Sequence, residues 1–76
     1  MSFTQDQLNF ISEMNNMNNN ELKDICKQLK VKQSRNGNSN KYIKRINLVE
    51  YYLNKTSDTF IDRKYYNHLV KWGEEK

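Results

Sequence analysis

The strongest constraint on the fold is a helix-start signal that occurs twice within the first 21 residues. Thr4 is followed three residues later by Gln7, and Asn18 is followed three residues later by Glu21. In such a capping box, the first side chain accepts a hydrogen bond from a backbone N–H in the first turn of a helix, and the second side chain bonds back to the capping residue. The repetition predicts two short helices separated by a break at Asn15–Asn16.

Apolar residues recur at helical spacing after each of these signals. The first helix is expected over residues 3–14, and the second from Asn18 to about Lys30. Their apolar stripes consist of Leu8, Ile11 and Met14 in the first helix and of Leu22, Ile25, Cys26 and Leu29 in the second. This spacing brings one face of each helix to the core. Because Cys26 lies on that face, we expect a small core residue there and not a reactive thiol.

A polar loop and a third helix are expected next. Residues 30–40 lack helical periodicity and contain the turn signal Asn36-Gly37, so they predict an extended loop with a tight turn. The third helix is expected over about residues 41–54, capped by either Ser39 or Asn40.

A fourth helix is expected over about residues 60–72, with Gly73 as its stop signal. Its predicted buried face consists of Ile61, Tyr65, Leu69 and Trp72. Residues 1–76 are therefore predicted to form one all-α, four-helix domain. A chain of this size buries only about 60% of its unfolded surface, so a deep catalytic cleft is not expected.

The composition excludes several classes of function. One cysteine and one histidine are too few for a disulfide framework or a structural zinc site, so we expect no cofactor and no metal. No apolar run exceeds three residues, which predicts neither a membrane-spanning helix nor a signal peptide. We therefore expect an intracellular protein of a reducing compartment, the cytoplasm or nucleus, without a membrane partner. No nucleophile–base pair is evident, so we do not expect an enzyme.

Positive charge is concentrated in the middle of the chain. The formal net charge is +4, but residues 25–49 contain seven Lys or Arg and no Asp or Glu. Three of these cations, Lys41, Lys44 and Arg45, occupy the first turns of the third helix, where the helix dipole disfavours positive charge. This placement favours a binding surface, and nucleic acid is the first anionic partner to expect. The alternative is a solvated basic face without a ligand.

Residues 17–54 also carry a motif. An apolar residue, a capping residue, two spacers and Glu-Leu-Lys run from Met17 to Lys23, and a basic residue followed by an apolar helix with Leu-Val-Glu runs from Arg45 to Glu50. The loop between them contributes Val31, Ser34 and Gly37. The stretch resembles the SAP family, whose module is a helix, an extended loop and a second helix. Here the loop is several residues longer, and Lys30 stands where that family often has glycine.

The resemblance implies a compact helical domain that binds double-stranded DNA, often AT-rich, with the loop and the start of the second motif helix against the phosphates. The residues expected to contact nucleic acid are Lys30, Lys32, Arg35, Asn36, Gly37, Asn38, Lys41, Tyr42, Lys44 and Arg45. Similar patterns occur in LEM and Rho N-terminal domains, some of which bind protein. The alternative is therefore a protein-interaction module, in which the basic surface or the aromatic residues of the last helix bind an acidic protein or a second copy.

Overall fold

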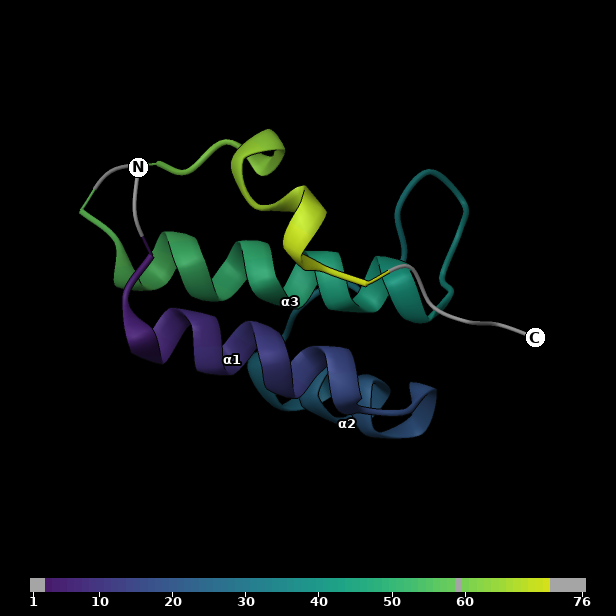
Figure 1. Cartoon of the computed structure of the whole chain (residues 1–76). Coiled ribbons are helices and arrows are strands. Elements are labelled where there is room, and N and C mark those ends of the chain that lie inside the picture. Colours follow the sequence, from purple (N-terminus) through teal and green to yellow (C-terminus); the bar gives the residue numbers. More distant parts are fainter. Residues whose placement is uncertain (1–2, 59, 72–76) are drawn as a thin grey trace.

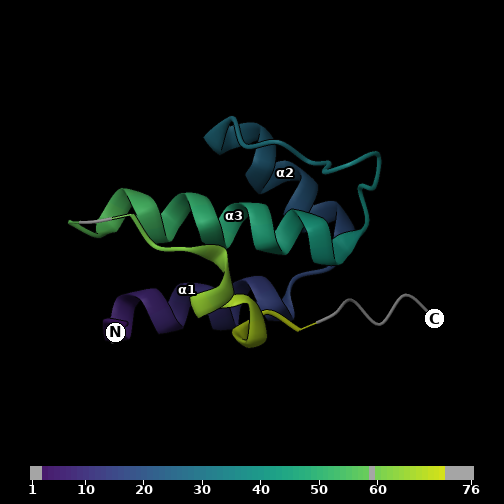
Figure 2. The ribbon, with the colours of Figure 1, turned by 90° about the horizontal axis from the view of Figure 1, so that it is seen from above.

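The computed structural model describes residues 3–58 and 60–71. These residues form three α-helices, α1 (Gln5–Asn16), α2 (Asn19–Leu29) and α3 (Lys41–Thr56), followed by two short 3-10 helices, η1 (Arg63–Tyr65) and η2 (Asn67–Leu69). The described part of the chain contains no β-strand, so the predicted all-α class is confirmed. α3 is central: α1 and α2 pack against it, and the segment that contains η1 and η2 crosses it from the other side (Figures 1 and 2).

Both predicted helix starts are confirmed. Gln7 N donates to Thr4 Oγ1 at 3.1 Å, and Thr4 N donates to Gln7 Oε1 at 2.8 Å. Asn18 and Glu21 form the same reciprocal pair at 2.9 and 3.0 Å. These bonds satisfy backbone N–H groups that have no partner within the helix. α1 continues through Asn16, so the break between the two helices begins two residues later than predicted.

The buried face of α1 differs from the prediction by one position. Gln7 is 4% exposed, whereas Leu8 is 39% exposed. The Gln7 side chain donates from Nε2 to Thr56 Oγ1 at 2.9 Å and to Ser57 Oγ at 3.1 Å. The same side chain therefore caps α1 and fastens its start to the end of α3. Because of these polar contacts, Gln7 faces the core, where the hydrophobic periodicity predicts Leu8.

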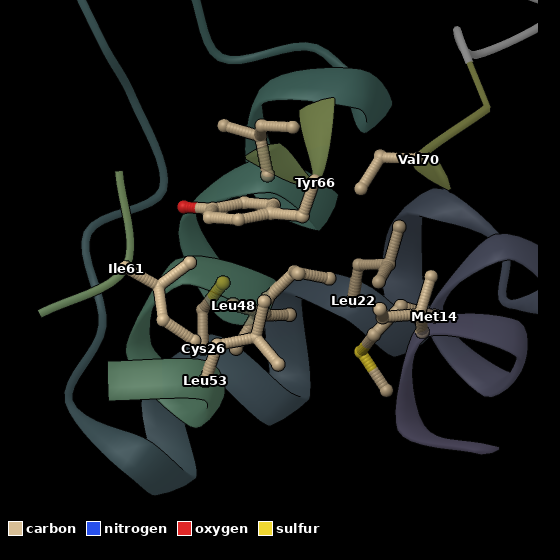
Figure 3. Packing of buried hydrophobic residues seen from close by; sticks show 11 residues of the cluster. Met14, Leu22, Cys26, Leu48, Leu53, Ile61, Tyr66 and Val70 are labelled. Carbon is tan, nitrogen blue, oxygen red and sulfur yellow. The ribbon is translucent and has the colours of Figure 1, made fainter. Parts of the chain in front are cut away.

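The core is assembled on α3. Phe10 of α1 stacks on Tyr52 of α3, with ring centroids 4.1 Å apart and planes inclined by 6°. The buried apolar cluster consists of Ile11, Met14, Leu22, Cys26, Ile46, Leu48, Val49, Leu53, Ile61, Tyr66 and Val70. In Figure 3, the three members from the C-terminal segment lie along one side of the cluster. Three helices and this segment thus share one core.

The predicted fourth α-helix is wrong for the residues described. Residues 60–71 bury Ile61, Tyr66 and Val70, whereas Tyr65 is 51% exposed. An α-helix would place Ile61 and Tyr66 about 140° apart around its axis, so it could not bury both side chains. Two short 3-10 helices redirect the chain at Tyr66 and bring both side chains to the core.

Two side-chain hydrogen bonds at the start of the C-terminal segment favour short helices there. The Asp62 side chain accepts a hydrogen bond from Lys64 N at 3.2 Å, which caps η1 and competes with a longer helix. Asn54 Oδ1 accepts from Ile61 N at 2.8 Å and fixes the entry of the segment against α3. Trp72 and Gly73, which were expected to complete and end a fourth helix, lie outside the described residues.

α2 ends at a residue in the left-handed conformation. Lys30 has φ 59° and ψ 41°. Its N–H donates to Lys27 O at 3.3 Å, and the next residue, Val31, donates from its N–H to Cys26 O at 2.8 Å. These two bonds are the Schellman motif that commonly ends helices at glycine. Val31 packs against the core as the chain leaves the helix.

Replacing Lys30 with glycine is expected to raise the free energy of unfolding by about 0.5–1 kcal/mol. The left-handed conformation costs a residue with a Cβ roughly 1–2 kcal/mol, and glycine avoids this cost. Part of the stability gained in this way is lost because glycine is more flexible in the unfolded chain. Thermal unfolding followed by circular dichroism should show a midpoint several degrees higher. The matched variant Lys27→Gly, within α2, should lower the midpoint instead. A lower midpoint for Lys30→Gly would contradict the expectation.

Candidate nucleic-acid interface

The loop between α2 and α3 has a well-defined turn at its tip. Asn36 and Gly37 have positive φ angles of 52° and 83°. Two consecutive positive φ values are typical of a type I′ turn, which favours Asn-Gly. Arg35 and Asn38 flank the turn and exchange two backbone hydrogen bonds, at 2.7 and 2.9 Å. The predicted tight turn is confirmed, and it projects from the body of the molecule beside the start of α3 (Figure 1).

Asn47, on α3, holds the first half of the loop. Its Nδ2 donates to Lys32 O at 3.1 Å and to Ser34 O at 3.3 Å, while its Oδ1 accepts from Arg63 Nη2 at 3.2 Å. One buried amide thus joins the loop, α3 and the C-terminal segment. Asn47 is absent from the predicted contacts. The sequence signal for Asn47 is a polar residue directly between Ile46 and Leu48 in the predicted third helix.

Glu50 forms the charged centre beside this amide. Its Oε1 lies 2.8 Å from Arg63 Nη2 and 4.0 Å from Arg35 Nη1. Burial, followed by the negative charge of Glu50, raises the pKa of the nearby Tyr66 to about 12, although the positive charge of Arg63 opposes that rise. The phenol therefore stays neutral. The Arg35 side chain is 47% exposed, and a partly exposed pair at this distance stabilises a protein by at most about 1 kcal/mol. Arg35 can therefore turn from Glu50 to an external anion.

The predicted contact residues fall into an exposed group and a less accessible group. The exposed group consists of Lys30, Lys32, Arg35, Asn36, Gly37 and Asn38, all on the loop. Lys41 and Tyr42, in the first turn of α3, are half-buried. The Tyr42 hydroxyl donates to Asn67 Oδ1 at 2.6 Å, so this ring is held against η2. Lys41 therefore stands at the start of α3, directly after the loop, and Tyr42 beside it is bonded to the C-terminal segment.

The expectation that Lys44 and Arg45 lie on an exposed binding surface is wrong. Both residues are buried: Lys44 is 4% exposed and Arg45 is 5% exposed. Lys44 Nζ donates to the Ser39 carbonyl oxygen and so ties the end of the loop to the first turns of α3. Asn40, one of the two predicted caps of α3, accepts from Ile43 N at 2.9 Å. These contacts fix where the loop ends and leave Lys44 turned inward.

Arg45 is directed to the end of α1. Its Nε donates to Met14 O at 3.0 Å, and its Nη2 donates to Asn15 O at 3.0 Å and to Met17 O at 3.4 Å. Its Nη1 donates to Lys71 O at 2.9 Å. The last carbonyls of a helix lack partners within it and carry the negative end of the helix dipole, so a cation is favoured there. Arg45 is unfavourable for the start of α3 but caps α1 and fastens the C-terminal segment.

Cys26 is a core residue, as predicted, and is 0% exposed. Its sulfur lies 3.9 Å from Lys32 O, towards which the thiol donates. Burial raises the pKa of the Cys26 thiol above its usual value, and the positive charge of Lys44 opposes that rise. The buried thiol therefore remains protonated at neutral pH and packs as a small apolar side chain.

Comparisons with known proteins give no match: no protein-family model, curated protein or solved structure matches the chain. Over residues 3–58 and 60–71, no three His, Cys, Asp or Glu side chains gather where they could hold a metal ion. None of the helices in the same residues is both long and apolar enough to cross a membrane.

Proposed function

We propose that this domain binds double-stranded DNA, without catalysis, through the loop between α2 and α3. One observation carries the proposal. The loop exposes Lys30, Lys32 and Arg35 along an extended chain whose tip is fixed by the Asn36-Gly37 turn. Between Asp24 and Glu50 the sequence contains no acidic residue to repel phosphate. Cations on such a scaffold suit the regular phosphates of a duplex.

The order of α2, loop and α3 supports a SAP-like interpretation of residues 17–54. The left-handed Lys30 stands where that pattern often has glycine, and its backbone adopts a conformation that suits glycine. The proposed contact set is narrower than the one predicted from sequence, because Lys44 and Arg45 are buried and the Tyr42 hydroxyl is bonded to Asn67. It consists of Lys30, Lys32, Arg35, Asn36, Gly37, Asn38 and Lys41.

Sequence-tolerant binding follows from the chemistry of this set. Lysine, asparagine and backbone N–H groups hydrogen-bond to phosphate oxygens, which are the same in every sequence. The start of α3 adds the positive end of its helix dipole beside Lys41. Any preference for AT-rich DNA would then come from groove shape, with Arg35 as the side chain suited to a narrow minor groove.

The proposal predicts steep salt dependence. If Lys30, Lys32, Arg35 and Lys41 each neutralise one phosphate, the plot of log affinity against log salt concentration should have a slope of about −3.6. Fluorescence anisotropy with a labelled duplex should therefore show affinity falling about 10²-fold between about 50 and 200 mM salt. Binding that is indifferent to salt over this range would overturn the proposal.

A second candidate is self-association through the C-terminal segment. Phe60 is 74% exposed and Tyr65 is 51% exposed, which is unusual for large apolar side chains and typical of protein interfaces. Light scattering coupled to size-exclusion chromatography tests this candidate. A stable dimer that does not bind duplex, and that dissociates in Phe60→Ser, would favour it over DNA binding.

A further inference from the structure

A pocket of about 390 Å³ opens between the loop and α3. The loop wall includes Ser34 and Arg35, and the α3 wall includes Glu50, Tyr51 and Asn54. The loop runs beside α3 from the end of α2 to the start of α3 (Figure 2), so the pocket adjoins the exposed loop cations. Its volume is near the lower end of the about 300–1,000 Å³ typical of ligand pockets, which suits one small planar group.

The polar groups of the α3 wall are partly used by the fold. Glu50 Oε1 holds Arg63, while Oε2 has no bond within the described residues. Asn54 Oδ1 accepts from Ile61 N, so its Nδ2 is the side that can donate to a ligand. The Tyr51 hydroxyl accepts from Lys55 Nζ at 3.4 Å and keeps its own proton to donate. The wall therefore offers a carboxylate acceptor, two donors and an aromatic ring.

We infer that this pocket holds one unpaired nucleobase of the bound DNA, an inference that rests on the proposed function. Lys55 Nζ lies over the Tyr51 ring, 5.5 Å from its centroid, so a base would stack on the opposite face of this ring. Such stacking is the usual way in which proteins bind unpaired bases. The Glu50 carboxylate accepts hydrogen bonds from an exocyclic amino group, such as that of cytosine. Arg35 lies at the rim and meets the adjoining phosphate.

The chemistry of the pocket also sets a base preference. Cytosine and adenine present an exocyclic amino group to Glu50, whereas thymine offers only its N3–H, which lies between two carbonyl oxygens that a carboxylate repels. Extracting a base from an intact duplex costs a few kcal/mol, and a base that is already unpaired avoids most of this cost. The domain should therefore favour a duplex that contains one unpaired cytosine over the fully paired duplex.

The test compares three duplexes of one sequence: fully paired, with one extra unpaired cytosine, and with one extra unpaired thymine. The full chain should bind the cytosine bulge about tenfold more tightly than the paired duplex, because stacking of one base commonly contributes a factor of this size or more. The affinity for the thymine bulge should exceed that for the paired duplex by a smaller factor. Equal affinity for the bulged and paired duplexes would overturn the pocket assignment, whereas no binding to any of the three would overturn the proposed function itself.

A variant that fills the pocket tests its role separately from that of the loop cations. Ser34→Phe places an aromatic ring on the loop wall without changing the charge, so it should abolish the preference for the cytosine bulge, measured as the ratio of its affinity for the bulged duplex to its own affinity for the paired duplex. Ser39→Phe, on the same loop but outside the pocket lining, is the matched control and should keep the preference. Retention of the preference in Ser34→Phe would contradict the assignment.

Two further measurements test the identity of the ligand. Glu50→Gln should remove most of the discrimination between cytosine and thymine bulges, because the amide can both donate and accept. It is checked for folding by circular dichroism, since Glu50 also holds Arg63. Deoxycytidine monophosphate serves as a free competitor. If it bound as tightly as the bulged duplex, the pocket would belong to free mononucleotides and the inference would be overturned.

Discussion

Replacing Arg45 with methionine is expected to lower the free energy of unfolding by at least about 3 kcal/mol. The substitution keeps an unbranched chain of similar length but removes the donors that serve the carbonyls of Met14, Asn15, Met17 and Lys71. The bond to Met14 O is buried and the other three bonds are partly buried, and an acceptor that loses its partner away from water costs about 1–3 kcal/mol. A chain of this length has a total stability of about 4–11 kcal/mol, so the substitution removes a large part of it.

Urea unfolding followed by circular dichroism measures this effect. The midpoint should fall by roughly 1–3 M, given slopes of about 1–3 kcal/mol per molar urea for small domains. Arg45→Lys should be intermediate, because an ammonium group cannot reach four carbonyls with the geometry of a guanidinium. The control is Lys23→Met, which removes an exposed cation from α2 and should change stability by about 0.5 kcal/mol or less. If Arg45→Met unfolded at the same urea concentration as this control, the capping role of Arg45 would be wrong.

Neutralising the exposed loop cations is expected to weaken duplex binding by about 10²-fold near 100 mM salt. The variant carries Lys30→Gln, Lys32→Gln and Arg35→Gln. Each lost phosphate contact removes one counterion-release contribution, so the salt slope should become shallower by about 2.7. These side chains are exposed, and the Arg35–Glu50 pair is long at 4.0 Å, so the fold should be retained.

The chain offers a control that is matched in charge. Lys55, Lys64 and Lys71 are also exposed, and all three lie outside the loop. Changing these three to glutamine lowers the formal net charge of +4 by the same amount as the loop variant does. Fluorescence anisotropy, measured for both triple variants at one salt concentration, should show that the control loses only severalfold in duplex affinity. Equal losses for the two triple variants would mean that net charge, and not the loop, determines binding.

The local features of the fold could be predicted from sequence. The Thr4–Gln7 and Asn18–Glu21 pairs locate two helix starts because capping depends only on residues three positions apart. The Asn36-Gly37 turn follows from the ease with which this pair adopts positive φ. Both are local preferences that tertiary contacts reinforce and do not oppose.

The features that sequence could not predict depend on where distant segments meet. Arg45 looks like a surface cation at a helix start, and only the position of the α1 end reveals the carbonyls that it caps. Gln7 replaces Leu8 on the buried face because the end of α3 offers two hydroxyl groups to its amide. The C-terminal segment has helical spacing, yet the core requires Tyr66 where α-helical geometry would supply Tyr65.

A titration of the ¹⁵N-labelled chain with a short, fully paired DNA duplex shows the interface residue by residue through the backbone amide signals. If the loop binds DNA, the signals of residues 30–41 should shift progressively as duplex is added at about 50 mM salt, a concentration at which phosphate contacts are strong. The signals of residues 60–71 should change little. Shifts confined to residues 60–71, or no shift at any residue, would contradict DNA binding through the loop.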